Sequence, residues 1–309
     1  MMILKYSIPA TQAGMTVYTV LRRQLGLSAT LTRRLKQAHA IFCDGQPVFT
    51  TQPLEAGQTV WVDVDAAEPQ CDVVPEPGHV EILWETAFLL AVNKPAGTLT
   101  HPSRAKYTGT LANHVAQYFA ETRASSACHA VNRLDRDTSG VVLFAKNAYA
   151  KELGVRALST GQKEYLAITL GALDTPEGII DLPIRRQAEG DMRRMVAPDG
   201  QHAVTHYQTC HVGALLGQTV SLLRLHLETG RTHQIRVHMA ACGHPLLGDR
   251  LYGCAASVAL SESLGLNAHL LHADTLAFQD PASGQPVCIH APVHRADMQE
   301  ILTELKIYS

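Results

Sequence analysis

The sequence predicts an α+β fold, with a large mixed or antiparallel bent sheet and flanking helices, preceded by a small α+β module. From Val80 onward, strand-like segments dominate and helices are interspersed irregularly, without the regular alternation of a doubly wound fold. Residues 1–66 show a compact pattern of their own, and the acidic stretch at 67–79 contains three prolines, as extended linkers do. We therefore expect a small module at 1–66, a linker at 67–79 and a larger domain at 80–309.

The small module is expected to contain two helices followed by short strands. Apolar residues at helical spacing from Val17 to Leu25 predict the first helix, and Gly26 suits its C-terminal cap. A second helix is expected over Leu31–His39, with Thr30 as its N-cap. The predicted strands are Ile41–Cys43, Val48–Phe49 and Thr59–Val64, the first two joined by an Asp-Gly turn at 44–45.

The larger domain is expected to form its sheet from apolar segments of four to ten residues. VEILWE and FLLAVNK predict a hairpin, and VVLFAK predicts a short buried strand. Further strands are predicted at EYLAITLG, AVTHYQT, VSLLRLHLE and HLLHADTLAF, and helices at 110–120, 147–159, 232–242 and 294–306.

Charge must be considered locally, because the formal net charge is only −2. Nucleic-acid-binding domains commonly have a pI above about 9. Between positions 22 and 36, however, five residues are basic and none is acidic. A solvated helix face is the plain alternative, but such a cluster suits phosphate contacts. The candidate RNA-binding residues of this cluster are Arg22, Arg23, Arg33, Arg34 and Lys36.

Several classes of protein are disfavoured by what the chain lacks. No run of 18 apolar residues predicts a membrane helix, and the first residues lack the apolar core of a signal peptide, so we expect a cytoplasmic protein. Seven cysteines without a CxxC pair argue against a disulfide framework. The His-x-x-x-His pairs at 202–206 and 290–294 lack the glutamate of the HExxH zinc motif, and no phosphate-binding glycine loop occurs. We expect neither a metal nor a cofactor.

The densest polar segment is NRLDRDTSG at 132–140, directly before the buried strand VVLFAK. Asp, Thr, Ser and Gly favour a tight turn. In an extended segment, Arg133 and Asp135 would share one face and Leu134 would anchor the other. Spacing alone leaves an ordinary turn as the favoured interpretation, with a catalytic carboxylate as the alternative.

A second polar segment, LETGRTHQIRVHMAACGHPLLGD, spans 227–249. Thr232 is expected to cap a helix whose Ile235 and Met239 face the core, four residues apart. Arg231 and Arg236 then lie on or near the first turns. A solvated arginine face is again the plain alternative.

Taken together, these segments resemble one family. NRLDRDTSGVVLFAKN resembles the signature of the RluA-type pseudouridine synthases. LLAVNKPAGTLTHP, KEYLAITLG, LETGRTHQIRVHMAACGHPLLGDRLYG and HLLHADTLAF resemble further blocks of that family, in its order, across residues 80–280. Residues 14–64 are similar in pattern to the small RNA-binding domain named after a ribosomal small-subunit protein, which often precedes this catalytic domain.

The resemblance implies isomerisation of uridine to pseudouridine in RNA by a pseudouridine synthase fold, without cofactor or metal. By position, Asp135 is the reactive carboxylate, Tyr165 is the aromatic residue beside the base and Arg236 pairs with the aspartate. Arg133 would keep the flipped nucleotide out of its stack. The carboxylate has three possible first steps: attack on the sugar, attack on carbon 6 of the base, or removal of the proton on sugar carbon 2.

One position departs from the family, which commonly has His where this chain has Asn132. That departure leaves the substrate more open than the reaction. Ribosomal and transfer RNA are both plausible partners, and we expect a monomer without an obligate protein partner. Two other function classes remain as alternatives: a non-catalytic RNA-binding protein that retains the scaffold, and a metal-dependent hydrolase, for which no ligand cluster is evident.

Overall fold

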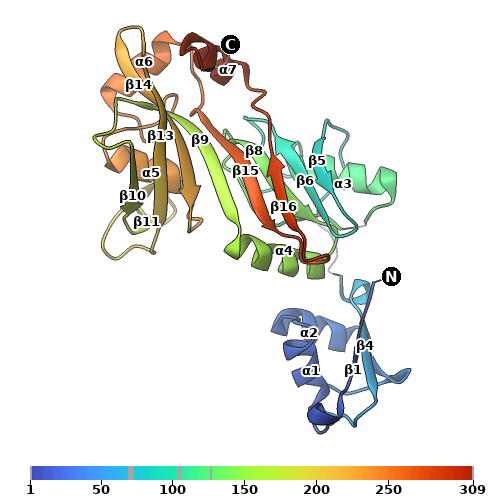
Figure 1. Cartoon of the computed structure of the whole chain (residues 1–309). Coiled ribbons are helices and arrows are strands. Elements are labelled where there is room, and N and C mark those ends of the chain that lie inside the picture. Colours follow the sequence, from blue (N-terminus) through green and yellow to red (C-terminus); the bar gives the residue numbers. More distant parts are fainter. Residues whose placement is uncertain (1, 69–72, 104–105, 126, 308–309) are drawn as a thin grey trace.

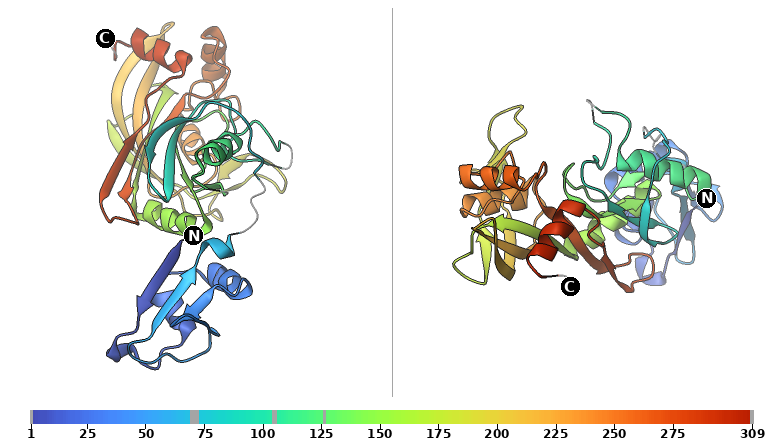
Figure 2. Two further views of the ribbon diagram at one scale, coloured as in Figure 1. Left: turned by 90° about the vertical axis from the view of Figure 1, so that its right-hand side faces the viewer. Right: turned by 90° about the horizontal axis from the view of Figure 1, so that it is seen from above.

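The computed structural model describes residues 2–68, 73–103, 106–125 and 127–307, which form two units (Figure 1). The small unit comprises residues 2–68 and lies at one end of the larger one, as the views in Figure 2 also show. In the described part of the chain, no helix has the combined length and apolar character needed to cross a membrane.

The small unit is a four-stranded sheet in the order β1-β4-β2-β3, with two helices packed on it. Its core is its own, since the buried apolar side chains from Ile8 to Ala67 cluster together. Its elements are β1 Ile3–Ser7, η1 Ala10–Gln12, α1 Val17–Arg23, α2 Ala29–Gln37, β2 Ile41–Cys43, β3 Gln46–Pro47, β4 Thr59–Asp63 and η2 Asp65–Ala67.

Two local predictions for this unit are wrong. Ser28, rather than Thr30, caps α2, because the Ser28 hydroxyl accepts a hydrogen bond from Leu31 N at 3.0 Å. The strand after the Asp-Gly turn is Gln46–Pro47 rather than Val48–Phe49. Both turn residues have positive φ, 46° and 83°, which is typical of a two-residue hairpin turn, so pairing resumes immediately after it.

The large unit is built on a ten-stranded sheet with the main order β10-β13-β14-β9-β15-β8-β6-β5, and with β16 on β15 and β7 on β8. The β8–β15 pair is parallel, whereas the β9–β15 and β6–β8 pairs that flank it are antiparallel. The predicted mixed sheet is therefore confirmed. The strands are β5 Glu81–Glu85, β6 Leu89–Lys94, β7 His129–Ala130, β8 Ser139–Ala145, β9 Gln162–Leu170, β10 Glu177–Asp181, β13 Val204–Leu215, β14 Gln218–Leu227, β15 Leu271–Gln279 and β16 Pro286–His290; a separate hairpin is formed by β11 Ile184–Arg186 and β12 Arg194–Val196.

Helices cover both faces of this sheet. On β6, Leu90 and Val92 pack with α3, whereas Leu89 and Ala91 pack with α4 on the opposite face. This two-sided burial explains why residues 89–92 of β6 form a continuous apolar run rather than an alternating one. The same division occurs on β14, where α5 packs on one face and α6 and α7 on the other. The helices are α3 Leu111–Thr122, α4 Ala148–Thr160, α5 Gln234–Ala241, α6 Ala255–Ser263 and α7 Ala296–Glu304.

The parallel junction of β8 and β15 depends on Gly140. Its φ is +113°, and a Cβ there would lie 2.1 Å from the carbonyl oxygen of Ala273. Only glycine permits this approach. The close contact places the loop before β8 at the centre of the sheet, near β15 and β9.

The two units are joined by hydrogen bonds at the N-terminal half of α4. Ala148 N donates to a carboxylate oxygen of Glu68 at 2.8 Å, and Ser28 N donates to Glu152 at 3.0 Å. Residues 69–72 of the predicted linker lie outside the described residues. Its end, residues 73–79, lies against α3, where the Asn113 side chain donates to Val74 O at 2.8 Å.

Candidate active site

The segment before β8, residues 132–138, is held by side chains from the turn that follows β6. The Thr100 hydroxyl donates to Leu134 O at 3.0 Å and accepts from Leu134 N at 3.2 Å. Asn132 holds the other side, since its amide oxygen accepts from Leu143 N at 2.7 Å. The residue that departs from the family pattern thus has a structural contact to β8. We call residues 132–138 the Asp135 loop.

Lys94 also holds the Asp135 loop in place. It is fully buried, and its ammonium donates to the carbonyl oxygens of Pro95, Thr98 and Arg136 at 2.9, 2.7 and 2.8 Å. Burial lowers the pKa of Lys94 to about 7, against the opposing charges of Asp137 and Asp135. Three carbonyl acceptors nevertheless match the three N–H donors that only the ammonium form supplies.

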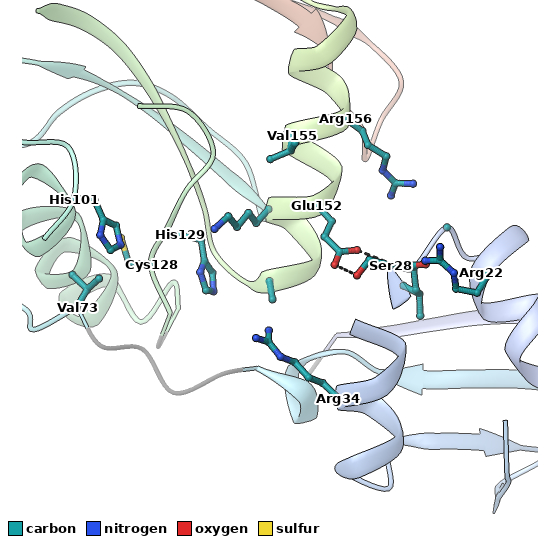
Figure 3. Close-up of a pocket in the computed structure, with 14 residues that line it drawn as sticks. Arg22, Ser28, Arg34, Val73, His101, Cys128, His129, Glu152, Val155 and Arg156 are labelled. Carbon is teal, nitrogen blue, oxygen red and sulfur yellow. Dashed lines mark hydrogen bonds between the residues drawn. The ribbon is translucent and has the colours of Figure 1, made fainter. Parts of the chain in front are cut away.

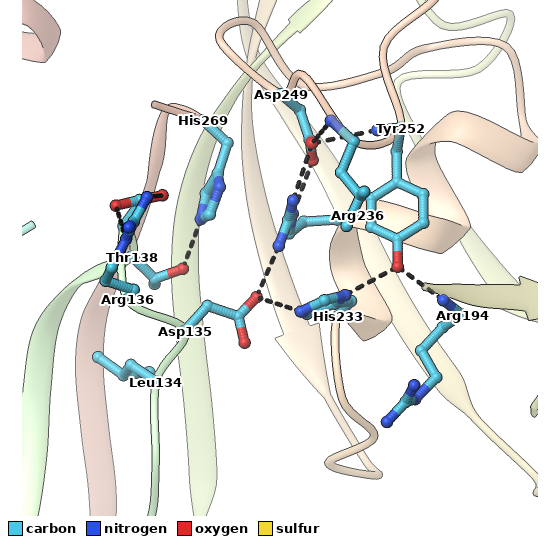
Figure 4. Close-up of polar contacts among 12 residues, drawn as sticks. Leu134, Asp135, Arg136, Thr138, Arg194, His233, Arg236, Asp249, Tyr252 and His269 are labelled. Atoms are coloured by element: carbon cyan, nitrogen blue, oxygen red, sulfur yellow. Dashed lines mark hydrogen bonds and ion pairs between the residues drawn. The ribbon is translucent and has the colours of Figure 1, made fainter. Parts of the chain in front are cut away.

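The loop directs Asp135 toward the first turn of α5 (Figure 4). One carboxylate oxygen, Oδ2, lies 3.1 Å from Nη1 of Arg236 and 3.7 Å from Nε2 of His233. The carboxylate is 27% exposed, so it is reachable from solvent. The structure therefore brings together Asp135 and Arg236, which are 101 residues apart in the chain.

Arg236 is held in place by a second carboxylate. Its Nε and Nη2 donate to Asp249 at 2.7 and 2.8 Å, and its guanidinium lies 5.0 Å from the ring centre of Tyr252. Burial disfavours the charged form of Arg236, but the hydrogen bonds and charge of Asp249, followed by the charge of Asp135, raise its pKa. Burial likewise opposes ionisation of Asp249, yet the Arg236 guanidinium lowers the pKa of that carboxyl. Each member of the pair therefore favours the ionised form of the other.

A small cavity of about 70 Å³ opens at this point. Tyr165, half-buried on β9, lines it together with Arg133 and Asp135. Burial, and then the charge of Asp135, raises the pKa of Tyr165 to about 12. Arg133 is exposed and makes no ion pair with any described residue. The predicted catalytic residues and Arg133 thus share one cavity.

Several residues that shape this site were not predicted from the sequence. They lay inside the quoted family blocks, but nothing in their local spacing assigned them a contact. Gln234 also changes one prediction: its amide oxygen accepts from Arg231 N at 2.9 Å, and His233, not Thr232, is the N-cap of α5. The missed residues are Lys94, Thr100, His233, Asp249, Tyr252 and His269, the last of which is hydrogen-bonded to Thr138 at 2.8 Å.

The predicted RNA-binding cluster lies elsewhere, on the small unit. Arg22 and Arg34 line a hollow of about 810 Å³ between the small unit and α4 (Figure 3), which we call the inter-unit cleft. Arg23, Arg33 and Lys36 are exposed but do not line it. From the large unit, α4 contributes Lys151, Glu152, Val155 and Arg156 to the cleft wall.

Comparison with known proteins identifies the family of this site. A model of the family described as RNA pseudouridylate synthase matches residues 88–241. The RNA pseudouridine synthase YhcT of Bacillus subtilis is 36% identical over 300 residues, covering 96% of each chain. The chain belongs to the RNA pseudouridine synthase family. The enzyme class predicted from the sequence is thereby confirmed.

Other family members agree. Ribosomal large subunit pseudouridine synthase D of Xanthomonas campestris is 35% identical, covering 89% of this chain and 84% of that protein. Among solved structures, human RNA pseudouridylate synthase domain containing 1 superimposes with a TM-score of 0.57 at 24% identity, covering 75% of this chain and 98% of the other. That likeness shows the pseudouridine synthase fold.

Proposed function

We propose that this pseudouridine synthase isomerises specific uridines in structured RNA, with Asp135 as the reactive carboxylate. The observation that carries the proposal is the ion pair that lines the cavity, in which Arg236 Nη1 lies 3.1 Å from Asp135 Oδ2. Nη1 of Arg236 donates to Oδ2 of Asp135, and a carboxylate held in this way can attack a carbon or remove a proton with its other oxygen. Arg236 contacts two carboxylates. Asp135 is the one that reaches solvent, because the Asp249 side chain is only 1% exposed.

The reaction needs no second acid to release the base. The bond from the base nitrogen to sugar carbon 1 breaks, the uracil turns, and carbon 5 bonds to the same sugar carbon. The proton on carbon 5 is then lost, and the nitrogen that had been bound to the sugar gains a proton, so that the product is an isomer of uridine. Asp135 can begin this sequence at the sugar carbon, at carbon 6 of the base, or by taking the proton from sugar carbon 2. All three routes require the same free carboxylate oxygen.

The base must leave its stack before it reaches Asp135, which costs a few kcal/mol. We assign Tyr165 the aromatic contact with the flipped uracil, since stacking returns about 1–3 kcal/mol per base. Arg133 lines the same cavity, and its guanidinium forms no ion pair with any described residue. We propose that this guanidinium fills the space that the flipped nucleotide leaves in the RNA, or binds the adjoining phosphate.

For the substrate, we propose ribosomal RNA ahead of transfer RNA. The Xanthomonas relative is named for the large ribosomal subunit. We further propose that the small unit is an RNA-binding module of the small-ribosomal-subunit-protein type. Support comes from the inter-unit cleft, where Arg34, Lys151 and Arg156 form no ion pair with any described residue.

The cleft and Asp135 lie at opposite ends of β8. His129 of the cleft is paired with Ala145 at one end, and Lys94, which holds the Asp135 loop, is paired with Gly140 at the other. Five residue steps of about 3.3 Å give a separation of roughly 17 Å. A structured RNA segment is long enough to contact both, so the cleft would set the position of the target uridine.

The decisive test compares Asp135→Asn with Asp137→Asn, which makes the same change two residues away. RNA carrying tritium on carbon 5 of uridine releases tritium when pseudouridine forms. We expect Asp135→Asn to abolish release and Asp137→Asn to retain it, because Asp137 pairs with the exposed Arg136. Release by Asp135→Asn at the normal rate would refute the assignment. RNA binding without release by the wild-type protein, on total cellular RNA, would favour the non-catalytic alternative.

A further inference from the structure

His233 lies between Asp135 and Tyr252, and its backbone has a conformation that non-glycine residues seldom adopt. Its φ and ψ are 58° and 20°, in the left-handed region. A residue with a Cβ is disfavoured there, and such strain concentrates at functional sites. The conformation places the imidazole, only 10% exposed, with Nε2 toward Asp135 and Nδ1 toward Tyr252 (Figure 4).

The hydrogen bonds around Tyr252 select one form of this imidazole. Arg194 N donates to the Tyr252 hydroxyl oxygen at 2.8 Å, so that oxygen is already an acceptor. The hydroxyl proton is then available to His233 Nδ1, also 2.8 Å away, and in this pairing Nδ1 is the acceptor. With that hydrogen bond, the neutral imidazole carries its proton on Nε2, the nitrogen that faces Asp135.

The two oxygens of Asp135 differ in their surroundings. Oδ2 faces both Arg236 Nη1 at 3.1 Å and His233 Nε2 at 3.7 Å. Oδ1 has no hydrogen bond from any described residue. The hydrogen bond from Arg236 and the nearby His233 both lie on the Oδ2 side, which orients the carboxylate and leaves Oδ1 as the oxygen that meets the substrate.

We propose that His233 is a positioning residue of the isomerisation: as the Nε2–H tautomer selected by Tyr252, it holds Oδ2 of Asp135 so that Oδ1 meets the uridine. This inference rests on the proposed role of Asp135. It assigns Tyr252 a second task beyond its contact with the Arg236 guanidinium, namely to set the tautomer of His233.

The charges around His233 support a neutral ring. Burial lowers the pKa of His233; the nearby Asp135 opposes this, and Arg236 and Arg194 reinforce it, while Asp249 opposes it again. Arg133 and Arg231 line the same cavity. An imidazolium would stand in a buried position beside the guanidinium groups of Arg236 and Arg194, which disfavour it. The Tyr252 hydroxyl proton also occupies the Nδ1 position that a second ring proton would take.

The tautomer is measured directly by long-range ¹H–¹⁵N correlation spectra of the full chain with ¹⁵N-labelled histidine. The spectrum of His233→Gln identifies the His233 signal by its loss. At pH 7 we expect the pattern of a neutral ring protonated on Nε2. Tyr252→Phe should mix the two tautomers and move protonation of His233 to higher pH. A ring protonated on Nδ1, or an imidazolium at pH 7, would overturn the proposal.

Kinetics test the consequence with His233→Phe and His233→Gln, which carry the same backbone penalty because neither side chain is β-branched. Phe removes the donor, whereas the Gln amide restores one. We expect Phe to lower kcat by roughly 10- to 100-fold, the range for a hydrogen bond to a charged group, to which the 3.7 Å contact tightens when the substrate binds. KM for RNA should stay within a few-fold, and Gln should recover most of kcat.

Equal kcat for His233→Phe and wild type, or equal losses in Phe and Gln variants with a raised KM, would refute the positioning role. Tyr252→Phe supplies a separate readout: the acid limb of its kcat profile should lie at higher pH, since the neutral ring is the active form. Failure of the proposed function is distinguishable, because Asp135→Asn would then remain active whatever His233 does.

Discussion

At the scale of single residues, Tyr165 shows how the fold narrows a chemical role. It lies on β9, paired with Leu225 on one side and Ala273 on the other, and lines the cavity beside Asp135. Its hydroxyl has no hydrogen-bond partner among the described residues, and its pKa is raised to about 12, chiefly by burial. At neutral pH the phenol is therefore protonated. It can stack or donate a hydrogen bond, but the phenolate needed for a strong base is scarce.

Replacing Tyr165 by Phe separates these roles. Phe keeps the ring, so we expect single-turnover tritium release within about 10-fold of wild type, because stacking accounts for about 1–3 kcal/mol per base. A loss of more than about 100-fold would instead show that the hydroxyl takes part in proton transfer. Binding of RNA by the same variant, measured in parallel, should be unchanged.

At the scale of elements, the Asp135 loop is shaped by strands that precede it. Lys94 ends β6, and its ammonium joins the turn at 95–98 to Arg136 O in the loop. Thr100 holds Leu134 in the same way. The loop conformation is thus specified from outside, which suits a site whose carboxylate must be preorganised.

Lys94→Met tests this arrangement with Lys163→Met as its matched control. Met fills the space of Lys94 but leaves three buried carbonyls without a donor, each worth about 1–3 kcal/mol. Removal of the buried charge offsets part of the loss, so we expect a decrease of about 3 kcal/mol in unfolding free energy. Lys163 is half-buried on β9 and has no hydrogen-bonded partner among the described residues. Lys163→Met should therefore change the unfolding free energy by less than about 1 kcal/mol. Urea unfolding measures both, and equal stability of the two variants would contradict the role of Lys94.

At the scale of the whole molecule, the arrangement of the two units creates a basic surface that neither has alone. Arg22 and Arg34 come from the small unit, and Lys151 and Arg156 from α4. The only acid in the cleft wall, among the described residues, is Glu152, and it is hydrogen-bonded to Ser28. A chain with a net charge of −2 can therefore still present local positive potential to RNA.

Charge reversal in the cleft should weaken RNA binding without slowing chemistry. For Arg156→Glu we expect a lower affinity at low salt and a slope of log affinity against log salt smaller by about 1, as for one lost phosphate contact. Lys151→Glu should behave likewise, and kcat at saturating RNA should stay near wild type. Arg224→Glu, on β14 away from the cleft, makes the same change and should leave affinity unaltered. Identical behaviour of Arg156→Glu and Arg224→Glu would exclude the cleft as an RNA surface.

Much of the fold could be predicted because its signals are local. The β5–β6 hairpin, the buried β8 and the four helices predicted in the large domain follow from apolar periodicity. The short strands β10, β11 and β12 carried too few apolar residues to be found. The N-cap of α2 was misplaced because Ser28 and Thr30 are both good caps by residue type, and which hydroxyl accepts the bond depends on where the backbone turns.

From the sequence alone, the order of most elements and the family could be predicted, and Asp135, Tyr165 and Arg236 could be named as the candidate catalytic residues. Only the tertiary structure decided that Asp249 holds Arg236, that Lys94 and Thr100 hold the Asp135 loop, and that His233 adopts a left-handed backbone beside Tyr252. The physical reason is range. Periodicity and turn chemistry act within a few residues, whereas Asp135 and Arg236 are 101 positions apart and meet because the sheet brings β8 and the start of α5 together.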